Sequence, residues 1–169
     1  QVINRAYYKL VEIMDTCAIP VPKCSLHLCE APGGFVQACS EYTDNEWNWV
    51  ALSLPDSIVF NEDMLPMDYG TILYTNVNSF EPKPTYDLVT ADGATDVCHD
   101  SIEKDHFQLL LDETKVALKA LAPRGTLIIK FFEGGRTETI CWIAKLTTLF
   151  DQVSIIKPVS SRATNSERY

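Results

Sequence analysis

The sequence predicts an α/β domain in which helices flank a mostly parallel sheet. Short apolar runs of the kind that form strands alternate with longer segments of helical periodicity along the chain. Strands separated by helices join into a parallel sheet through crossover connections. The chain has 169 residues, which is enough for one compact core, so we expect residues 1–169 to form a single domain.

Each element follows from a local pattern. The first helix is expected at residues 5–14, where apolar residues recur every three or four positions. The run TLIIKFF at residues 126–132 is dense in strand-forming residues, and Pro158 ends the last expected strand. The other helices are expected at 35–42, 102–121 and 138–149, and the other strands at 24–28, 47–54, 72–77, 86–91 and 153–157.

Parallel sheets of this kind bind ligands at the carboxyl ends of their strands. Four polar features fall at or near such ends in this sequence: the turn at 30–35, Asn76, Asp92 and Lys130. We therefore expect a ligand site where these features meet.

Composition and charge limit the class of protein. Apolar residues make up 46% of the chain and charged residues 22%, which is ordinary for a globular domain. The net charge of −9 argues against a general nucleic-acid binder, because phosphate contacts need cations. The charge is uneven, however, since residues 1–24 carry +1 and residues 157–169 carry +2, which leaves −12 for the middle of the chain.

The sequence has no membrane signature and only a weak metal one. No apolar run reaches the roughly 18–20 residues that span a membrane, and the start does not resemble a signal peptide. Six cysteines occur without a CxxC pair, and Cys98, His99 and His106 form at most a weak metal cluster. We expect free thiols in an intracellular protein without a metal site, in the cytoplasm or the nucleus, with a viral origin open. The abrupt ends of the chain predict a segment of a larger polypeptide.

Two turns could carry chemistry. The sequence LCEAPGGF at residues 28–35 follows the first expected strand, where a glycine pair lets the backbone approach a ligand and opens a helix whose amides face it. By itself, PGG is also typical of a plain tight turn. Asp92 follows the strand at 86–91 and could be either a site carboxylate or a helix cap.

Lys130 is the most informative single residue. It lies within an otherwise apolar strand pattern, where an ammonium group is costly to bury without partners. The pattern indicates either a lysine at the mouth of a site, paired with carboxylates, or an edge strand whose lysine reaches solvent.

The two ends of the chain hold the remaining candidates. Residues 157–169 form a polar, cationic segment rich in hydroxyl groups, which suits phosphate or sugar contacts but also fits an ordinary surface loop. Lys9, in NRAYYKL, is by its local pattern a solvent-facing residue of the first helix.

Taken in this order, the motifs resemble the FtsJ-like family of ribose 2′-O-methyltransferases. That family carries a Lys-Asp-Lys-Glu tetrad on a Rossmann-like fold that binds S-adenosylmethionine (SAM). Lys9 matches the first lysine, Asp92 in VTADGA the aspartate, Lys130 in LIIKFFEGG the second lysine and Glu167 in SSRATNSERY the glutamate. The similarity covers residues 4–169. The family fold adds a last, antiparallel strand after the glutamate motif, which this sequence does not contain.

The resemblance implies a role for each matched residue. The tetrad is catalytic, and Lys130 contacts the reacting 2′-hydroxyl group, either as a base or as an orienting cation. The implied RNA contacts are Arg5, Ser161, Arg162, Asn165 and Arg168. The implied SAM contacts are Cys29, Glu30, Ala31, Pro32, Gly33, Gly34, Phe35, Ser53, Leu54, Asn76 and Asp92.

The sequence departs from the family pattern at two positions. An acidic residue is usual near the end of the first strand, where this chain has His27, and Glu30 could serve instead. Asn76 stands where the family can place an aspartate that holds the adenine amine, and its side-chain carbonyl could still accept from that amine.

The ending KPVSSRATNSERY is most similar to the mRNA cap-ribose branch of the family, found in eukaryotes and their viruses. This implies RNA as the partner, most specifically the 5′ end of capped mRNA, together with other domains or proteins of the capping machinery. Alternatives are methylation of ribosomal or transfer RNA, a small-molecule methyltransferase, and a non-catalytic RNA-binding module. A small-molecule enzyme would not need both lysines, and a non-catalytic module would be expected to lose tetrad residues, all four of which are present.

Overall fold

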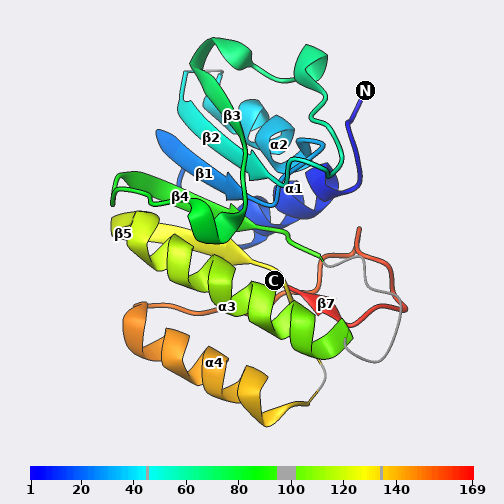
Figure 1. The fold of residues 1–169 in the computed structure, drawn as a ribbon, viewed down its shortest axis with the longest axis vertical. Helices are drawn as coiled ribbons and strands as arrows, with labels where there is room; N and C mark the ends of the chain where they lie inside the picture. The colour runs from blue at the N-terminus through cyan, green and yellow to red at the C-terminus, as the bar shows by residue number, and fades with distance from the viewer. Residues whose placement is uncertain (45, 95–101, 134) are drawn as a thin grey trace.

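A five-stranded sheet forms the centre of the computed structural model, which describes residues 1–44, 46–94, 102–133 and 135–169 (Figure 1). Its strand order is β3-β2-β1-β4-β5, and each neighbouring pair is parallel. The strands are β1 (Cys24–Leu28), β2 (Asn48–Ser53), β3 (Gly70–Tyr74), β4 (Tyr86–Ala91) and β5 (Leu121–Ile129). The helices are α1 (Ala6–Thr16), α2 (Gly34–Thr43), α3 (Ile102–Ala120) and α4 (Thr137–Leu149), with short 3-10 turns η1 (Glu62–Met64), η2 (Met67–Tyr69) and η3 (Val77–Ser79).

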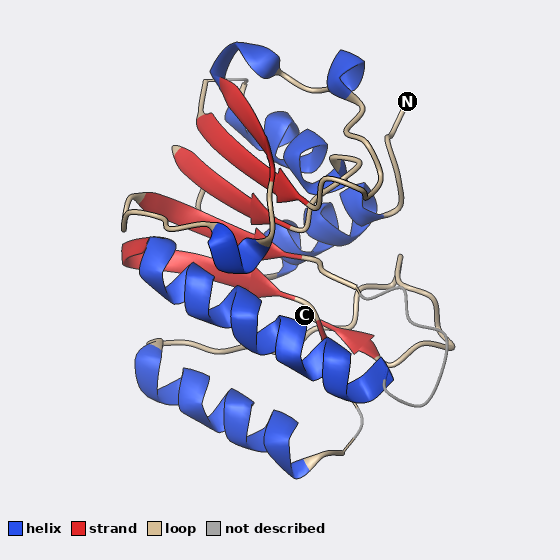
Figure 2. Ribbon diagram, viewed as in Figure 1, coloured by secondary structure: helices blue, strands red, loops and turns tan. Residues whose placement is uncertain are grey.

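Helices cover both faces of the sheet (Figure 2). Leu10 of α1 and Phe35 of α2 pack with Trp49 of β2 in one apolar core. Leu26 and Leu28 of β1 belong to a second core with α3 and α4. Because successive strand residues point to opposite faces, β1 contributes its leucines to one core and its polar residues to the other. The predicted fold class is confirmed.

The C-terminal segment returns to the carboxyl end of the sheet. Beyond β5, the short strand β6 (Phe131–Phe132) pairs antiparallel with β7 (Glu167–Arg168). The backbone of Tyr169 then exchanges two hydrogen bonds with Ile156, at 2.8 and 2.9 Å. These pairings hold the last residues of the chain against the ends of the sheet strands.

The strand predicted at residues 153–157 is wrong. In that range only Ile156 forms a backbone pair, with Tyr169, and no ladder continues on either side of it. Apolar alternation cannot by itself make a strand, because a strand also needs a neighbour along its length. The run predicted at residues 126–132 is likewise divided, since Lys130 separates β5 from β6.

The other predicted elements are present with small shifts at their ends. The strand predicted at 72–77 is shorter and earlier, because Asn76 starts the 3-10 turn η3 instead of extending β3. The strand β5 begins before the predicted run and includes Pro123-Arg124-Gly125, and its register with β4 shifts between Tyr86 and Leu88. Among the described residues, no helix has both the length and the apolar character to cross a membrane.

The strand order places a site at one particular edge. Because β1 lies between β2 and β4, the strand order reverses between β1 and β4, and the carboxyl ends of these two strands are where parallel sheets of this kind bind ligands. The LCEAPGGF turn follows β1, and Asp92 follows β4. The LCEAPGGF turn and Asp92 therefore lie at the switch point of the sheet.

Candidate active site

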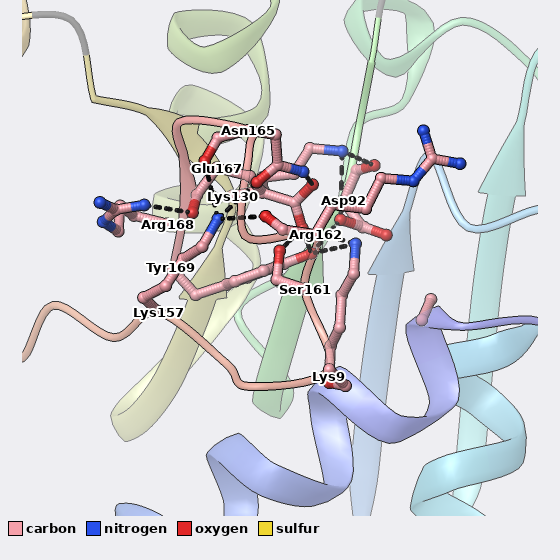
Figure 3. Close-up of polar contacts among 12 residues, drawn as sticks. Lys9, Asp92, Lys130, Lys157, Ser161, Arg162, Asn165, Glu167, Arg168 and Tyr169 are labelled. Atoms are coloured by element: carbon pink, nitrogen blue, oxygen red, sulfur yellow. Dashed lines mark hydrogen bonds and ion pairs between the residues drawn. The ribbon is translucent and has the colours of Figure 1, made fainter.

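Residues that are far apart in the sequence converge at this edge (Figure 3). Lys9 comes from α1, Asp92 follows β4, Lys130 follows β5, and Glu167 lies in β7. This arrangement agrees with the expectation from the sequence that the four side chains form one group.

The four residues form two ion pairs. Lys9 Nζ lies 2.5 Å from Glu167 Oε1. Lys130 Nζ lies 3.2 Å from Asp92 Oδ1 and donates a hydrogen bond of 2.9 Å to the backbone oxygen of Asp92. The side chain of Lys130 is 7% exposed, so these contacts are the partners that a buried ammonium requires.

Tyr169 joins the two pairs. Its hydroxyl oxygen lies 2.6 Å from Asp92 Oδ1 and 3.0 Å from Glu167 Oε1, while Lys9 Nζ lies 3.4 Å away. The hydroxyl has one proton, so it donates to one carboxylate at a time. Burial, together with the charges of Asp92 and Glu167, raises the pKa of Tyr169, which keeps the phenol protonated.

Glu167 is held by several neighbours. Ser161 Oγ donates to its Oε1 at 3.3 Å, and Asn165 Nδ2 donates to its Oε2 at 3.2 Å. Burial acts to raise the pKa of Glu167, but the hydrogen bond and charge of Lys9, aided by the charge of Lys130, outweigh it and lower the pKa. Glu167 is therefore the anionic centre of the C-terminal half of the site.

Two residues not predicted from the sequence fix the C-terminal loop. Glu12 of α1 accepts hydrogen bonds from the backbone N–H groups of Val159 and Ser160, at 2.6 and 2.9 Å. Lys157 Nζ donates to the backbone oxygens of Arg162 and Asn165, at 3.0 and 2.8 Å, and also to the side chain of Asn165. Glu12 lies on the same helical face as Lys9, three positions away, which was the available sequence signal.

Comparison with known proteins identifies the group to which this arrangement belongs. The profile of the FtsJ-like methyltransferase family matches residues 2–169. The chain belongs to the FtsJ-like methyltransferase family.

Relatives of this FtsJ-like domain come from viruses and animals. Probable methyltransferase EP424R of an African swine fever virus isolate is 27% identical over 205 residues, which cover 100% of this chain and 48% of the relative. Cap-specific mRNA (nucleoside-2′-O-)-methyltransferase 2 of Mus musculus is 29% identical over 211 residues, covering 100% of this chain and 27% of the relative. A cap-specific mRNA (nucleoside-2′-O-)-methyltransferase of Autographa californica nuclear polyhedrosis virus is 40% identical over 85 residues, 49% of this chain and 32% of the relative.

These relatives are longer than the FtsJ-like domain. The chain spans about half the length of the swine fever virus protein and less of the other two. The crystal structure of PH0851 has the same fold, with a TM-score of 0.62 and 16% sequence identity over 88% of this chain and 38% of that one. At this identity the likeness concerns the fold alone.

Contacts within the protein explain why both positions 33 and 34 of the LCEAPGGF turn are glycine. Gly33 has a φ of 116°, and a Cβ there would lie 3.0 Å from the Leu65 side chain. A Cβ on Gly34 would overlap Asn4 Oδ1, the atom that accepts from Ala6 N at the start of α1. On the side where a Cβ would project, the protein itself therefore fills the space beside each glycine, while the predicted approach of a ligand concerns the backbone.

Glu30 also has a structural partner. Its Oε1 accepts from the backbone N–H groups of Phe35 and Val36 at 2.7 and 3.0 Å, so it caps the start of α2. Burial is the main cause that raises the pKa of Glu30 to about 8. His27, at the position where the family usually has an acid, is fully buried between Ser25 Oγ and Thr90 Oγ1, at 2.8 and 2.7 Å. Burial lowers the pKa of His27 to about 3, so it is neutral.

A further buried carboxyl group lies near Asp92. Glu113 of α3 is 2% exposed and accepts from Gly93 N at 3.2 Å. Burial raises its pKa to about 8, although the charge of Lys130 and hydrogen bonds from Gly93 and the Cys29 thiol act in the opposite direction. Glu113 thus links the ends of β1 and β4. Sequence patterns gave no signal for this role.

The other predicted contacts are placed at the edges of the site. Ser53 is buried at the end of β2, next to Leu54, which is 51% exposed. The side-chain oxygen of Asn76 accepts from Asn78 N at 2.9 Å, so a local turn already uses it. The Arg168 side chain pairs with Glu133, with Nη2 2.6 Å from a carboxylate oxygen. Arg5 and Arg162 are exposed.

Two hollows border these elements. A hollow with a cavity volume of about 240 Å³ lies at the Lys9–Glu167 pair, between α1 and the C-terminal loop. A larger one runs along β5 and the segment after α4 and is lined by apolar side chains such as Ile129 and Leu146. None of the four matched residues lines the larger hollow. Of the weak metal cluster considered from sequence, Cys98 and His99 lie outside the described residues; the described residues hold no metal-like group of His, Cys, Asp or Glu.

Proposed function

We propose that this domain transfers a methyl group from SAM to a ribose 2′-oxygen of RNA, next to the 5′ cap of mRNA. The observation that supports it most is the unbroken series of contacts from Lys130 through Asp92, Tyr169 and Glu167 to Lys9 at the switch point of the sheet. Membership of the FtsJ-like family and the names of two relatives support the reaction and its substrate.

Lys130 is suited to the reacting hydroxyl group. An ammonium group has three N–H donors. One of them donates to the Asp92 backbone oxygen, and the nitrogen also forms an ion pair with Asp92 Oδ1. Another N–H of the ammonium form can orient the ribose oxygen, and a neutral amine can accept its proton through the lone pair.

The remaining tetrad residues act as positioning groups. When bound, SAM supplies a methyl group on a positively charged sulfur. The sulfur–methyl bond breaks as the oxygen–methyl bond forms, and the sulfur becomes part of a neutral thioether. Asp92 fixes Lys130, while Glu167 fixes Lys9 and is itself fixed by Ser161 and Asn165. Holding the nucleophile in line can supply much of the rate, because the leaving group is already activated.

The chemistry of the neighbouring residues fits SAM. The exposed Leu54 at the end of β2 offers an apolar surface for a purine, and Ser53 and Asn76 offer polar groups beside it. The carboxylate of Asp92 lies close enough to Glu30 and Glu113 to act on the pKa of each, and it offers a negative charge that suits a cationic ligand. The backbone of residues 29–35 would line the site at the end of β1.

The test measures methyl transfer by the full-length protein to three RNAs of related sequence: a capped RNA, a triphosphate-ended RNA and an internal fragment. The methylated nucleotide is then mapped by mass spectrometry. We expect methylation of the ribose next to the cap, with capped RNA preferred. Methylation of internal ribosomal or transfer RNA nucleotides without preference for a cap would favour the other branch of the family. Binding of RNA without any transfer would favour a non-catalytic module.

A further inference from the structure

The hollow at the Lys9–Glu167 pair has a distinct composition. Six residues line it: Arg5 and Lys9 from α1, and Ser160, Arg162, Asn165 and Glu167 from the C-terminal segment. All six are polar or charged, and none is aromatic. Such a lining suits a small, strongly polar group and offers no stacking surface for a nucleobase.

The charge of the hollow is not balanced from within. Lys9 and Glu167 neutralise each other at 2.5 Å. Arg5 and Arg162 are exposed, and neither guanidinium group forms a hydrogen bond or an ion pair in the part of the chain that the structure describes. The hollow is therefore lined by two cations without a partner among the described residues, in a chain whose net charge is −9.

Ser160 provides an independent observation. Its Oγ is buried and has no hydrogen-bond partner, the one such side-chain atom among the described residues. Buried hydroxyl groups are normally satisfied, so an unsatisfied one calls for an explanation. A ligand oxygen in the hollow that Ser160 lines would provide the missing partner.

The loop that carries Ser160 and Arg162 is already fixed. Glu12 holds the backbone N–H groups at its start, and Lys157 holds the backbone oxygens of Arg162 and Asn165. A preorganised loop loses little entropy when a ligand binds. The hollow is thus built before the ligand arrives, in the manner of a binding site.

We propose that this hollow binds one phosphate group of the RNA backbone beside the ribose presented to Lys130, through Arg5, Arg162 and the Ser160 hydroxyl. This assignment rests on the proposed function and deepens it. Guanidinium groups present paired N–H donors that match phosphate oxygens, and the hydroxyl adds a third donor. Arg168 is not part of the subsite, because it pairs with Glu133.

The experiment combines a protein change with a matching RNA change. The double variant Arg5→Ala/Arg162→Ala and the single variant Ser160→Ala are compared with Lys83→Ala/Lys145→Ala, which removes two exposed lysines far from the hollow in the sequence. Binding of short single-stranded RNA is measured at several salt concentrations in the full-length protein. In a second series, each phosphodiester in turn is replaced by an uncharged methylphosphonate.

We expect the double arginine variant to bind RNA about 10- to 100-fold more weakly, and Ser160→Ala less so, with SAM affinity unchanged. The salt slope should become shallower by about 0.7, the value for one phosphate on a single strand. One methylphosphonate position should weaken binding to the unchanged protein but not to the double arginine variant. That coupling identifies the phosphate that the hollow holds.

The alternatives give different results. RNA affinity and salt slope equal to those of the lysine control, or an equal penalty from every methylphosphonate, would overturn the subsite. A parallel loss of SAM affinity in the arginine variant would mean that the change acts on the fold. If the unchanged protein shows the coupling but transfers no methyl group, the subsite stands and the proposed function fails.

Discussion

The Tyr169 hydroxyl lies 2.6 Å from Asp92 Oδ1, a contact that connects residues 77 positions apart. The same oxygen lies 3.0 Å from Glu167 Oε1. Since Asp92 holds Lys130 and Glu167 holds Lys9, this phenol is the link between the two ion pairs of the site. The four matched residues therefore form one connected unit rather than two independent pairs.

The first prediction concerns this link. Tyr169→Phe removes the hydroxyl but keeps the ring that packs near Phe35. We expect single-turnover methyl transfer to fall by about 10-fold and unfolding stability to fall by about 1–3 kcal/mol, since a buried carboxylate loses a donor. Rapid-quench kinetics and chemical unfolding measure the two effects. An unchanged transfer rate with reduced stability would limit Tyr169 to a structural role.

The second prediction concerns Lys130. Lys130→Ala should reduce single-turnover transfer by about 10²–10⁴-fold, the usual range for a positioned acid–base group, with SAM affinity retained. Lys130→Arg separates the two possible roles, because arginine keeps the charge but cannot act as a base at ordinary pH. Substantial activity in Lys130→Arg would favour an orienting cation. Near-normal rates in Lys130→Ala would remove Lys130 from the mechanism.

The third prediction concerns pH. Burial raises the folded-state pKa of Glu30 and of Glu113 from 4.5 to about 8. Between these values the folded protein retains protons that the unfolded chain releases, so stability must fall as pH rises through this window. His27 acts in the opposite direction, because its pKa is lowered from 6.5 to about 3, so its contribution makes stability rise with pH. That contribution ends near pH 6.5, so measurements of stability from pH 6.5 to 8 report on the two carboxyl groups.

Glu30→Gln provides the matched variant for that measurement. Both helix N–H groups donate to one oxygen of Glu30, which the glutamine carbonyl can replace. The variant should lose part of the pH slope, up to about 1.4 kcal/mol per pH unit. Unfolding by denaturant at each pH measures it. A slope identical to that of the unchanged protein would show that Glu30 is not protonated in the folded state.

The fourth prediction concerns the close approach at Gly34. Gly34→Ala should destabilise the domain by about 1–3 kcal/mol, because the new methyl group overlaps the Asn4 side chain. Asn4→Ala removes a helix-start acceptor and should cost about 1 kcal/mol alone. In the double variant the overlap is relieved, so its loss of stability should be smaller than the sum of the losses in the two single variants. Strict additivity would mean that the clash lies elsewhere, such as at the backbone of Tyr7, 3.1 Å from the added atom.

Sequence reasoning reached the parts of the site that local patterns encode. Lys130 in an apolar run and Asp92 after an apolar strand both have local signatures, and the structure brings them together with Lys9 and Glu167. Tyr169 left a weaker signal: it stands two positions after Glu167, and residues two apart share a face of an extended chain.

Other features depend on tertiary contacts that no local pattern records. Glu12 meets Val159 across 147 positions of the sequence, and Glu113 reaches Gly93 across 20. The strand predicted at residues 153–157 failed for the same reason, since its residues have the composition of a strand but lack a neighbour along their length. Only the folded chain determines which side chains share a space.

The last prediction concerns Glu12, which fixes the loop that carries the RNA candidates. Its two carboxylate oxygens accept from different N–H groups: Oε2 from Val159 and Oε1 from Ser160. Glu12→Gln keeps one acceptor and puts an amide donor against an N–H group, so the start of the loop should loosen. We expect a raised KM for RNA with a smaller change in kcat, because Lys130 and Asp92 do not touch this loop end. Glu138→Gln, an exposed glutamate on α4, is the matched control. Faster hydrogen exchange at Val159 and Ser160 in Glu12→Gln, but not in the control, would locate the effect. If KM for RNA and exchange at these amides both equal those of the control, the Glu12 contact does not hold the loop in solution.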